Sequence, residues 1–160
     1  MDSLLELLKH NARLSNHEIA VMLGMTEDEV EAKIKDYERK GIIKGYSAII
    51  NEEIACKDCV TAFIELKVTP QAKYGYDDIA KTVMQYDEVE AVSLMSGAYD
   101  LSVVVRGTSL REIALFVSQR LATIDGVIST ATHFVLQKYK DKGITLFDSQ
   151  LDERGFVSPW

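Results

Sequence analysis

Long apolar runs are missing from this chain of 160 residues. A membrane-spanning helix requires roughly 20 consecutive apolar residues, and no segment approaches that length. The N-terminal sequence MDSLLELLKHN has acidic residues early and no small-residue cleavage site, so it lacks the pattern of a secretory signal. We therefore expect a cytoplasmic protein with no membrane partner.

The motifs of common catalytic and cofactor sites are also missing. The sequence contains no G-x-x-x-x-G-K-[ST] loop, no G-x-G-x-x-G loop and no run with metal-ligand spacing. His133 alternates with Phe134 along an apolar run and has no nucleophile assigned beside it, which favours a structural histidine. The sequence thus predicts a protein that is not an enzyme and has no cofactor or metal site.

Cysteine is scarce, with only Cys56 and Cys59 present at C-x-x-C spacing. A zinc site needs four ligands, and no second pair of cysteines follows. A redox pair usually opens a helix in a βαβ unit, whereas this pair precedes a strand-like run. We interpret the two residues as incidental thiols and keep a metal or redox role as the alternative.

Basic residues are too few to balance the acids, and the net charge is -7. Neutralisation of DNA phosphates requires Lys and Arg, so this balance argues mildly against DNA. Positive residues nevertheless gather between Lys33 and Lys44, where five of them accompany only Asp36 and Glu38. This local stripe predicts modest, non-specific DNA affinity that depends on pairing several DNA-binding heads.

The most informative pattern that is present covers residues 11–46, which contain two short helices joined by a tight turn at Gly24. Each helix begins with a hydroxyl residue followed three positions later by a glutamate: Ser15 and Glu18, Thr26 and Glu29. These pairs form capping boxes. With a leucine-rich helix before them, the two helices predict a helix-turn-helix head and therefore contact with DNA.

Strand-like runs dominate the rest of the chain. Residues 42–51 are rich in β-branched residues and predict a strand that forms a wing of the head. A second module follows in the order strand, helix, strand, strand, helix, strand: 61–69, 77–86, 89–95, 99–106, 110–124 and 127–139. This β-α-β-β-α-β order is the ferredoxin-like plan.

The predicted fold class is therefore α+β, with a winged helix-turn-helix head followed by a ferredoxin-like domain. We place the head at 1–50, a linker at 51–59, the ferredoxin-like domain at 60–140 and a tail at 141–160. Apolar residues such as Phe63 and Val104 occupy the sheet face that the helices leave open. We favour a two-fold dimer that covers this face, with the head or the tail as the alternative cover.

Five short motifs follow one another along the chain. They are Asn11-Ala12-Arg13, Leu23-Gly24-Met25-Thr26, Gly41-Ile42-Ile43-Lys44-Gly45-Tyr46, Met95-Ser96-Gly97-Ala98-Tyr99-Asp100 and Gly126-Val127-Ile128-Ser129-Thr130-Ala131-Thr132. In these motifs the chain resembles the Lrp/AsnC (leucine-responsive, feast/famine) transcription regulators over residues 3–140. The resemblance implies double-stranded DNA as a partner, dimers that assemble into tetramers or octamers, and in many members an amino-acid effector.

Candidate DNA contacts lie on the second helix of the turn, which the resemblance identifies as the recognition helix. We expect one set of residues to approach bases: Thr26, Asp28, Glu29 and Ala32. We expect another to contact phosphates: Lys33, Lys35, Arg39 and Lys44. The alternative is the solvated face of a helical adaptor for another protein.

Candidate effector contacts centre on the turn Gly97-Ala98-Tyr99-Asp100. Gly97 would let a ligand approach the backbone, and Asp100 could pair with the ammonium of an amino acid. By resemblance we add Thr130 and Thr132. On residue chemistry alone, Gly97 and Asp100 equally fit a hairpin turn and its cap. The sequence thus predicts an oligomeric, sequence-specific DNA-binding regulator modulated by a small metabolite; the alternative is a small-molecule-binding regulatory subunit that acts without DNA.

Overall fold

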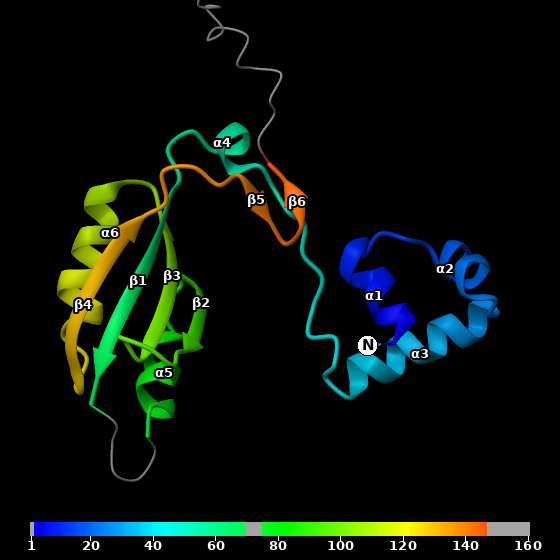
Figure 1. The fold of residues 1–160 in the computed structure, drawn as a ribbon, viewed down its shortest axis with the longest axis horizontal. Helices are drawn as coiled ribbons and strands as arrows, with labels where there is room; N and C mark the ends of the chain where they lie inside the picture. The colour runs from blue at the N-terminus through cyan, green and yellow to red at the C-terminus, as the bar shows by residue number, and fades with distance from the viewer. Residues whose placement is uncertain (1, 70–74, 147–160) are drawn as a thin grey trace, which may run out of the picture. The chain divides into compact units, whose positions relative to one another are not determined.

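The computed structural model describes residues 2–69 and 75–146 of the chain (Figure 1). The chain divides into two compact units between Ala48 and Ile49, each with a hydrophobic core of its own.

Three helices form the N-terminal unit: α1 (Ser3–His10), α2 (Asn16–Leu23) and α3 (Glu27–Arg39). Both predicted capping boxes are confirmed, because in each the cap hydroxyl accepts from the backbone and the glutamate reaches back to the cap. Gly24 ends α2 with a φ of 65°, a left-handed conformation that glycine adopts without strain. Leu4, Ile19 and Val30 lie at the centre of the unit, fully buried.

The strand predicted at 42–51 is wrong, since residues 42–50 take no strand conformation. Gly41 turns the chain out of α3 with a φ of 69°, and the backbone amides of Ile42 and Ile43 both donate to the carbonyl of Tyr37. A strand needs a neighbour to complete its hydrogen-bond ladder. Within the described residues, 42–50 have no such neighbour, so their β-branched character alone does not make a strand.

A four-stranded antiparallel sheet forms the C-terminal unit, in the order β2-β3-β1-β4. The strands are β1 (Val60–Val68), β2 (Val89–Leu94), β3 (Leu101–Gly107) and β4 (Val127–Phe134). The helices are α5 (Asp77–Val83), α6 (Leu110–Phe116) and the π-helical turn η1 (Val117–Leu121). The predicted β-α-β-β-α-β order is thereby confirmed, although the helix expected at 110–124 ends in a π-helical turn.

One face of the sheet carries the core. Alternate residues of β1 point to this face, and their partners on β3 share it: Ala62 with Val105, Ile64 with Val103 and Leu66 with Leu101. All six are almost completely buried and pack with Ile79, Val83, Ile113 and Leu121 of the helices. Burial of alternate residues on a central strand is what fixes the register of the sheet.

The open face is less apolar than predicted. Phe63 is half-buried there, between the rings of Tyr99 and His133 at centroid distances of 6.1 and 6.2 Å. Glu65 is the next residue of β1 on this face, and its carboxylate lies 3.4 Å from the His133 ring nitrogen. Charged and aromatic side chains therefore share a face on which the sequence predicted an apolar surface.

The segment expected to be a linker, 51–59, contains a short helix and a covalent bridge. Helix α4 (Glu52–Ala55) is followed by a disulfide between Cys56 and Cys59, so the prediction of two incidental thiols is wrong. The segment expected as a tail starts with a small hairpin of β5 (Lys140–Asp141) and β6 (Ile144–Thr145). Residues 147–160 of that tail lie outside the described residues. In the described part of the chain, no helix is long and apolar enough to cross a membrane.

A substitution at Leu66 tests how much the stability of the C-terminal unit depends on β1. Leu66→Ala removes a fully buried side chain and leaves a cavity, so we expect a loss of about 2–5 kcal/mol in the free energy of unfolding. Urea unfolding followed by circular dichroism measures this loss. Leu136→Ala is the control, because Leu136 is 95% exposed and its truncation should change stability by less than about 0.5 kcal/mol. Equal effects of the two substitutions would contradict the assigned core.

Candidate DNA-binding and effector-binding sites

Helix α3 presents a buried and an exposed side. Val30 is fully buried and Ile34 and Tyr37 pack against the same core. The predicted outer stripe is exposed: Asp28, Ala32, Lys35 and Arg39. The structure therefore brings these four predicted DNA-binding residues onto one accessible side of the helix.

Thr26 and Glu29 form the capping box of α3. The Thr26 amide donates to Glu29 Oε2 at 2.8 Å, and the Thr26 hydroxyl donates to the same oxygen at 3.0 Å. These bonds, the backbone one first, hold the pKa of Glu29 below its ordinary value. Both residues thus organise the start of the helix, a role that competes with contact to a base.

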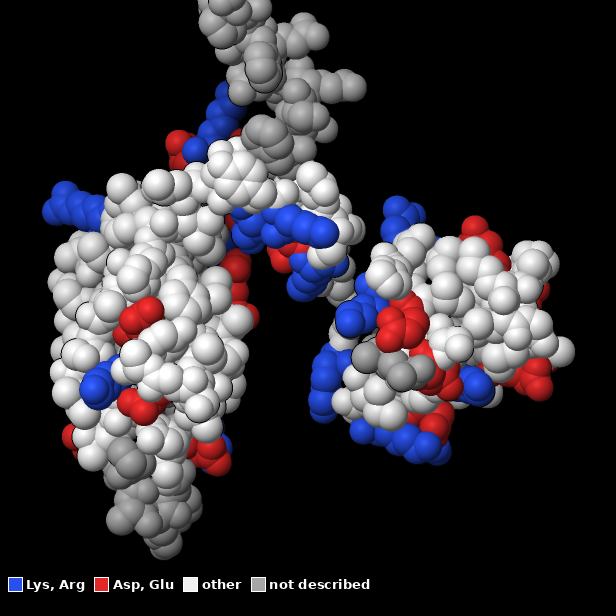
Figure 2. All heavy atoms as spheres, in the orientation of Figure 1, with Lys and Arg blue, Asp and Glu red and all other residues white. Residues whose placement is uncertain are grey.

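The basic residues of α3 are paired with acids. Lys35 pairs with Glu31, Arg39 and Lys40 pair with Asp36, and Lys33 Nζ lies 3.9 Å from Asp2 Oδ2. The hydrogen bond to Glu31 raises the pKa of Lys35. Figure 2 accordingly shows positive and negative side chains next to each other on the visible side of the head.

Lys44 differs from the other predicted phosphate contacts. Among the described residues it has no ion-pair partner, and its amine lies near Gly41, where an added Cβ would be 2.8 Å away. The predicted stripe of five positive residues is therefore largely neutralised within the head, with Lys44 as its unpaired end.

The turn that includes Gly97, Ala98, Tyr99 and Asp100 joins β2 to β3. An added Cβ at Gly97 would meet nothing within 4 Å, so a ligand has room to approach this backbone. Asp100 Oδ2 accepts a hydrogen bond of 2.9 Å from the Val68 amide, while the Asp100 amide donates to Leu66. One carboxylate oxygen thus fastens the turn to the end of β1.

Thr130 and Thr132 lie on a different face from Tyr99. On β4 they are paired with Leu66 and Ile64, which point to the core side of the sheet, and both are half-buried. Tyr99 instead packs against Phe63 on the open face. The structure does not bring the two threonines and the tyrosine ring together on one face of a single protomer.

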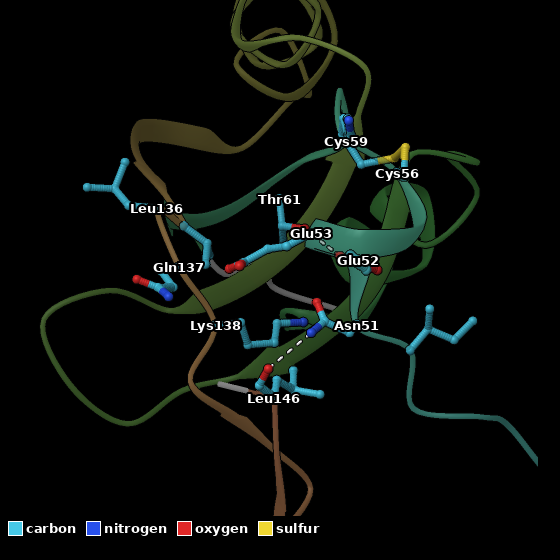
Figure 3. A pocket seen from close by; sticks show the side chains of 13 residues that line it. Asn51, Glu52, Glu53, Cys56, Cys59, Thr61, Leu136, Gln137, Lys138 and Leu146 are labelled. Atoms are coloured by element: carbon cyan, nitrogen blue, oxygen red, sulfur yellow. Dashed lines mark hydrogen bonds between the residues drawn. A yellow bond between two sulfur atoms is a disulfide. The ribbon is translucent and has the colours of Figure 1, made fainter. Parts of the chain in front are cut away.

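A hollow that the sequence analysis did not identify lies beside α4 (Figure 3). Its volume is about 290 Å³, and its lining includes charged, polar and apolar side chains together with the disulfide: Glu52, Glu53, Cys56, Lys57, Cys59, Thr61, Gln137, Lys138 and Leu146. Asn51 Nδ2 donates to the Leu146 carbonyl at 3.0 Å across it. The C-x-x-C spacing was the one sequence signal that pointed to this place.

Two domain families account for most of the chain. Residues 3–44 match the winged helix-turn-helix DNA-binding family, and residues 61–145 match the Lrp/AsnC ligand binding domain. The HTH-type transcriptional regulator YugG of Bacillus subtilis is 44% identical over 157 residues, covering 98% of this chain and 95% of that protein. The chain belongs to the Lrp/AsnC family.

Solved structures of transcription regulators share the fold of this chain. The structure of Escherichia coli AsnC has a TM-score of 0.69 and 26% identity, covering 90% of this chain and 97% of that one. The transcriptional regulator NMB0573 of Neisseria meningitidis, solved as a complex with L-Met, has a TM-score of 0.71 and 26% identity, covering 88% and 93%. These similarities confirm both the winged helix-turn-helix class and the ferredoxin-like plan of the sequence analysis.

Acidification tests the two capping boxes of the Lrp/AsnC head. Backbone and hydroxyl hydrogen bonds from Ser15 and Thr26 hold the pKa values of Glu18 and Glu29 below the ordinary 4.5. Folding therefore favours their charged forms, and the stabilisation present above pH 4.5 is lost as the pH falls below it. We expect the thermal midpoint of the head to fall between about pH 6 and about pH 3.5, and to fall less in Glu18→Gln/Glu29→Gln.

Glu6→Gln is the matched control for this experiment, because Glu6 is a helical glutamate outside both capping boxes. Its pH profile should follow that of the unmodified protein. If the double variant also keeps the full slope, the capping carboxylates are not the groups that titrate.

Proposed function

We propose that this chain is a sequence-specific transcription regulator that binds double-stranded DNA through α3. The single observation that carries the proposal is the exposed stripe of α3, on a helix that two capping boxes and the Gly24 turn hold in a helix-turn-helix. In such heads the second helix enters the major groove and its N-terminal part contacts base edges.

Asp28 and Ala32 are the leading candidates for base contacts. Thr26 and Glu29 would have to break the hydrogen bonds of the capping box to reach a base. Asp28 and Ala32 are exposed, and neither side chain takes part in the capping box. An aspartate can accept a hydrogen bond from cytosine N4, and an alanine can contact the thymine methyl group. These two residues therefore offer discrimination between bases at the start of the helix.

Phosphate contacts fall to Lys33, Lys35, Arg39 and Lys44. The first three would exchange an acidic partner within the head for a phosphate. Each of these contacts therefore contributes less binding free energy than a contact from an unpaired lysine would. Weak single heads favour an oligomer in which several heads bind together. Heads of a dimer reach successive major grooves when they lie roughly 34 Å apart.

Lys35 and Glu31 give a matched test of this interface. Lys35→Ala removes one phosphate contact, so we expect weaker binding to all sequences and a salt dependence flatter by roughly one unit of log-log slope. Glu31→Gln removes the acid that competes for Lys35, and should strengthen binding at low salt. Electrophoretic mobility shifts over a series of salt concentrations measure both effects.

Arg111→Ala is the control for charge, since Arg111 is an exposed residue on α6 of the other unit. Its salt slope should equal that of the unmodified protein. If the salt dependence of binding is unchanged in Lys35→Ala, Lys35 does not contact the DNA backbone. If the unmodified protein gives no mobility shift at low salt, the alternative is favoured, namely a regulatory subunit that acts without DNA. The ion pairs within the head are consistent with that alternative as well.

Self-association through the open face of the sheet is part of the proposal. Phe63 and Val104 remain only half-buried there, and a second copy placed sheet against sheet would cover both. Dimers of this kind could then assemble into tetramers or octamers. The supporting observation is an aromatic row, Tyr99, Phe63 and His133, on the face opposite the one against which α5 and α6 pack.

An amino-acid effector at the turn 97–100 completes the proposal. Support comes from the open space at Gly97, from the second carboxylate oxygen of Asp100 and from the L-Met complexes among the structural relatives. Thr130 and Thr132 could join this site from a neighbouring protomer. An effector bound between protomers would change the assembly state and thereby the affinity for DNA, and the coupling is reciprocal.

Asp100→Asn tests the effector site while keeping an acceptor for the Val68 amide. Loss of the charge that pairs with the ligand ammonium should weaken binding about tenfold or more. Isothermal titration with a panel of amino acids measures affinity, and light scattering in the same solutions measures assembly. Asp125→Asn, at an exposed position before β4, should bind as the unmodified protein does. No binding by the unmodified protein across the panel would contradict the effector proposal.

A further inference from the structure

Cys56 and Cys59 lie where α4 ends and β1 begins. Their Cα atoms are 5.4 Å apart, within the range that a disulfide spans, and both side chains are half-buried. Both also line the hollow of about 290 Å³ beside α4. A small reagent can therefore reach the bridge from the hollow without the sheet opening.

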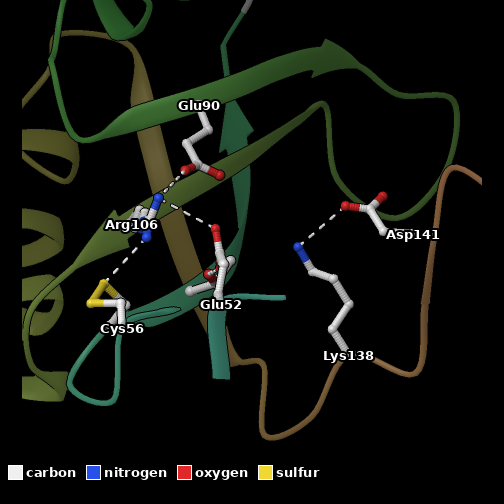
Figure 4. Close-up of polar contacts among 8 residues, drawn as sticks. Glu52, Cys56, Glu90, Arg106, Lys138 and Asp141 are labelled. Atoms are coloured by element: carbon white, nitrogen blue, oxygen red, sulfur yellow. Dashed lines mark hydrogen bonds and ion pairs between the residues drawn. A yellow bond between two sulfur atoms is a disulfide. The ribbon is translucent and has the colours of Figure 1, made fainter. Parts of the chain in front are cut away.

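Arg106 places a positive charge next to one of the two sulfurs. Its Nη2 lies 3.3 Å from Cys59 Sγ, and its Nη1 lies 3.3 Å from Glu52 and 3.9 Å from Glu90 (Figure 4). The two carboxylates hold the guanidinium in this orientation. A guanidinium beside a cysteine stabilises the thiolate, which is the reactive form of the side chain.

The bridge contributes little that other contacts do not already provide. It closes a very short loop, and short loops gain the least stability from a disulfide. Helix α4 is also held by the Glu52–Arg106 ion pair, by a Thr61–Glu52 hydrogen bond of 3.5 Å and by the Asn51–Leu146 bond. Within the described residues no further ligand joins the two cysteines in a metal-binding cluster.

We propose that Cys56 and Cys59 form a reversible thiol–disulfide pair that exchanges with low-molecular-weight disulfides, with Cys59 as the attacking sulfur. In the reduced protein the Cys59 thiolate attacks a reagent R–S–S–R, forms a mixed disulfide and releases one thiolate. Cys56, as its thiolate, then attacks Cys59 Sγ and releases the second. The protein loses two electrons and two protons, and the reagent becomes two R–SH.

A redox titration of the full chain tests reversibility. The protein is equilibrated without oxygen in mixtures of reduced and oxidised glutathione, quenched in acid, alkylated and weighed by mass spectrometry. We expect both cysteines to change together, in one two-electron transition that has the same midpoint from either direction. A pair that stays oxidised, or stays reduced, across all mixtures would overturn the proposal.

Alkylation of single-cysteine variants tests the role of Cys59. At pH near 7, Cys56→Ser should react with iodoacetamide about fivefold faster than Cys59→Ser, because Arg106 raises the thiolate fraction of Cys59. Adding Arg106→Gln to Cys56→Ser should abolish this advantage, and adding Arg106→Lys should retain part of it. Arg111→Gln in the same background is the control and should leave the rate unchanged.

Circular dichroism of each variant establishes that it is folded. If the Arg106→Gln protein is not folded, the alkylation rates of Cys56→Ser and Cys59→Ser still decide whether Cys59 is the attacking sulfur. Equal rates for the two single-cysteine proteins would overturn it.

Discussion

The position of β1 at the centre of its sheet is the constraint on which the C-terminal unit depends. This strand pairs with β3 on one side and β4 on the other, and its alternate residues supply the middle of the core. A slip by one residue would exchange Ile64 and Leu66 with Glu65 and Lys67. Burial of two charges is far more costly than burial of two aliphatic side chains, so the register and both neighbouring strands are fixed together.

Periodicity and capping allowed most of the fold to be predicted from sequence. The capping boxes at Ser15 and Thr26 depend on residues three positions apart, and the order of the strands follows from local runs of β-branched residues. Residues 42–51 have the same local character as the true strands. Among the described residues no strand pairs with them, and such pairing depends on the tertiary arrangement rather than on their own sequence.

The candidate sites were less predictable because most of their contacts join residues that are far apart in the sequence. The Glu31–Lys35 pair is an exception, since its spacing of four positions on one helix is the spacing that favours an ion pair. Thr130 and Thr132 were grouped with Tyr99 by resemblance, and the register of β4 sends them to the other face. The contact between Arg106 and Cys59 joins residues 47 positions apart, a separation that no local pattern encodes.

The bond between Asp100 and the Val68 amide has a consequence for any ligand that uses this carboxylate. A ligand that displaces the amide from Asp100 Oδ2 breaks this bond at the end of β1, where the ladder to β4 is already irregular. Leaving a buried donor unpaired costs about 1–3 kcal/mol, which corresponds to a site weaker by roughly five- to 150-fold. Such a site would need a correspondingly higher ligand concentration to fill, so its threshold would be set by the backbone of the strand as much as by the ligand.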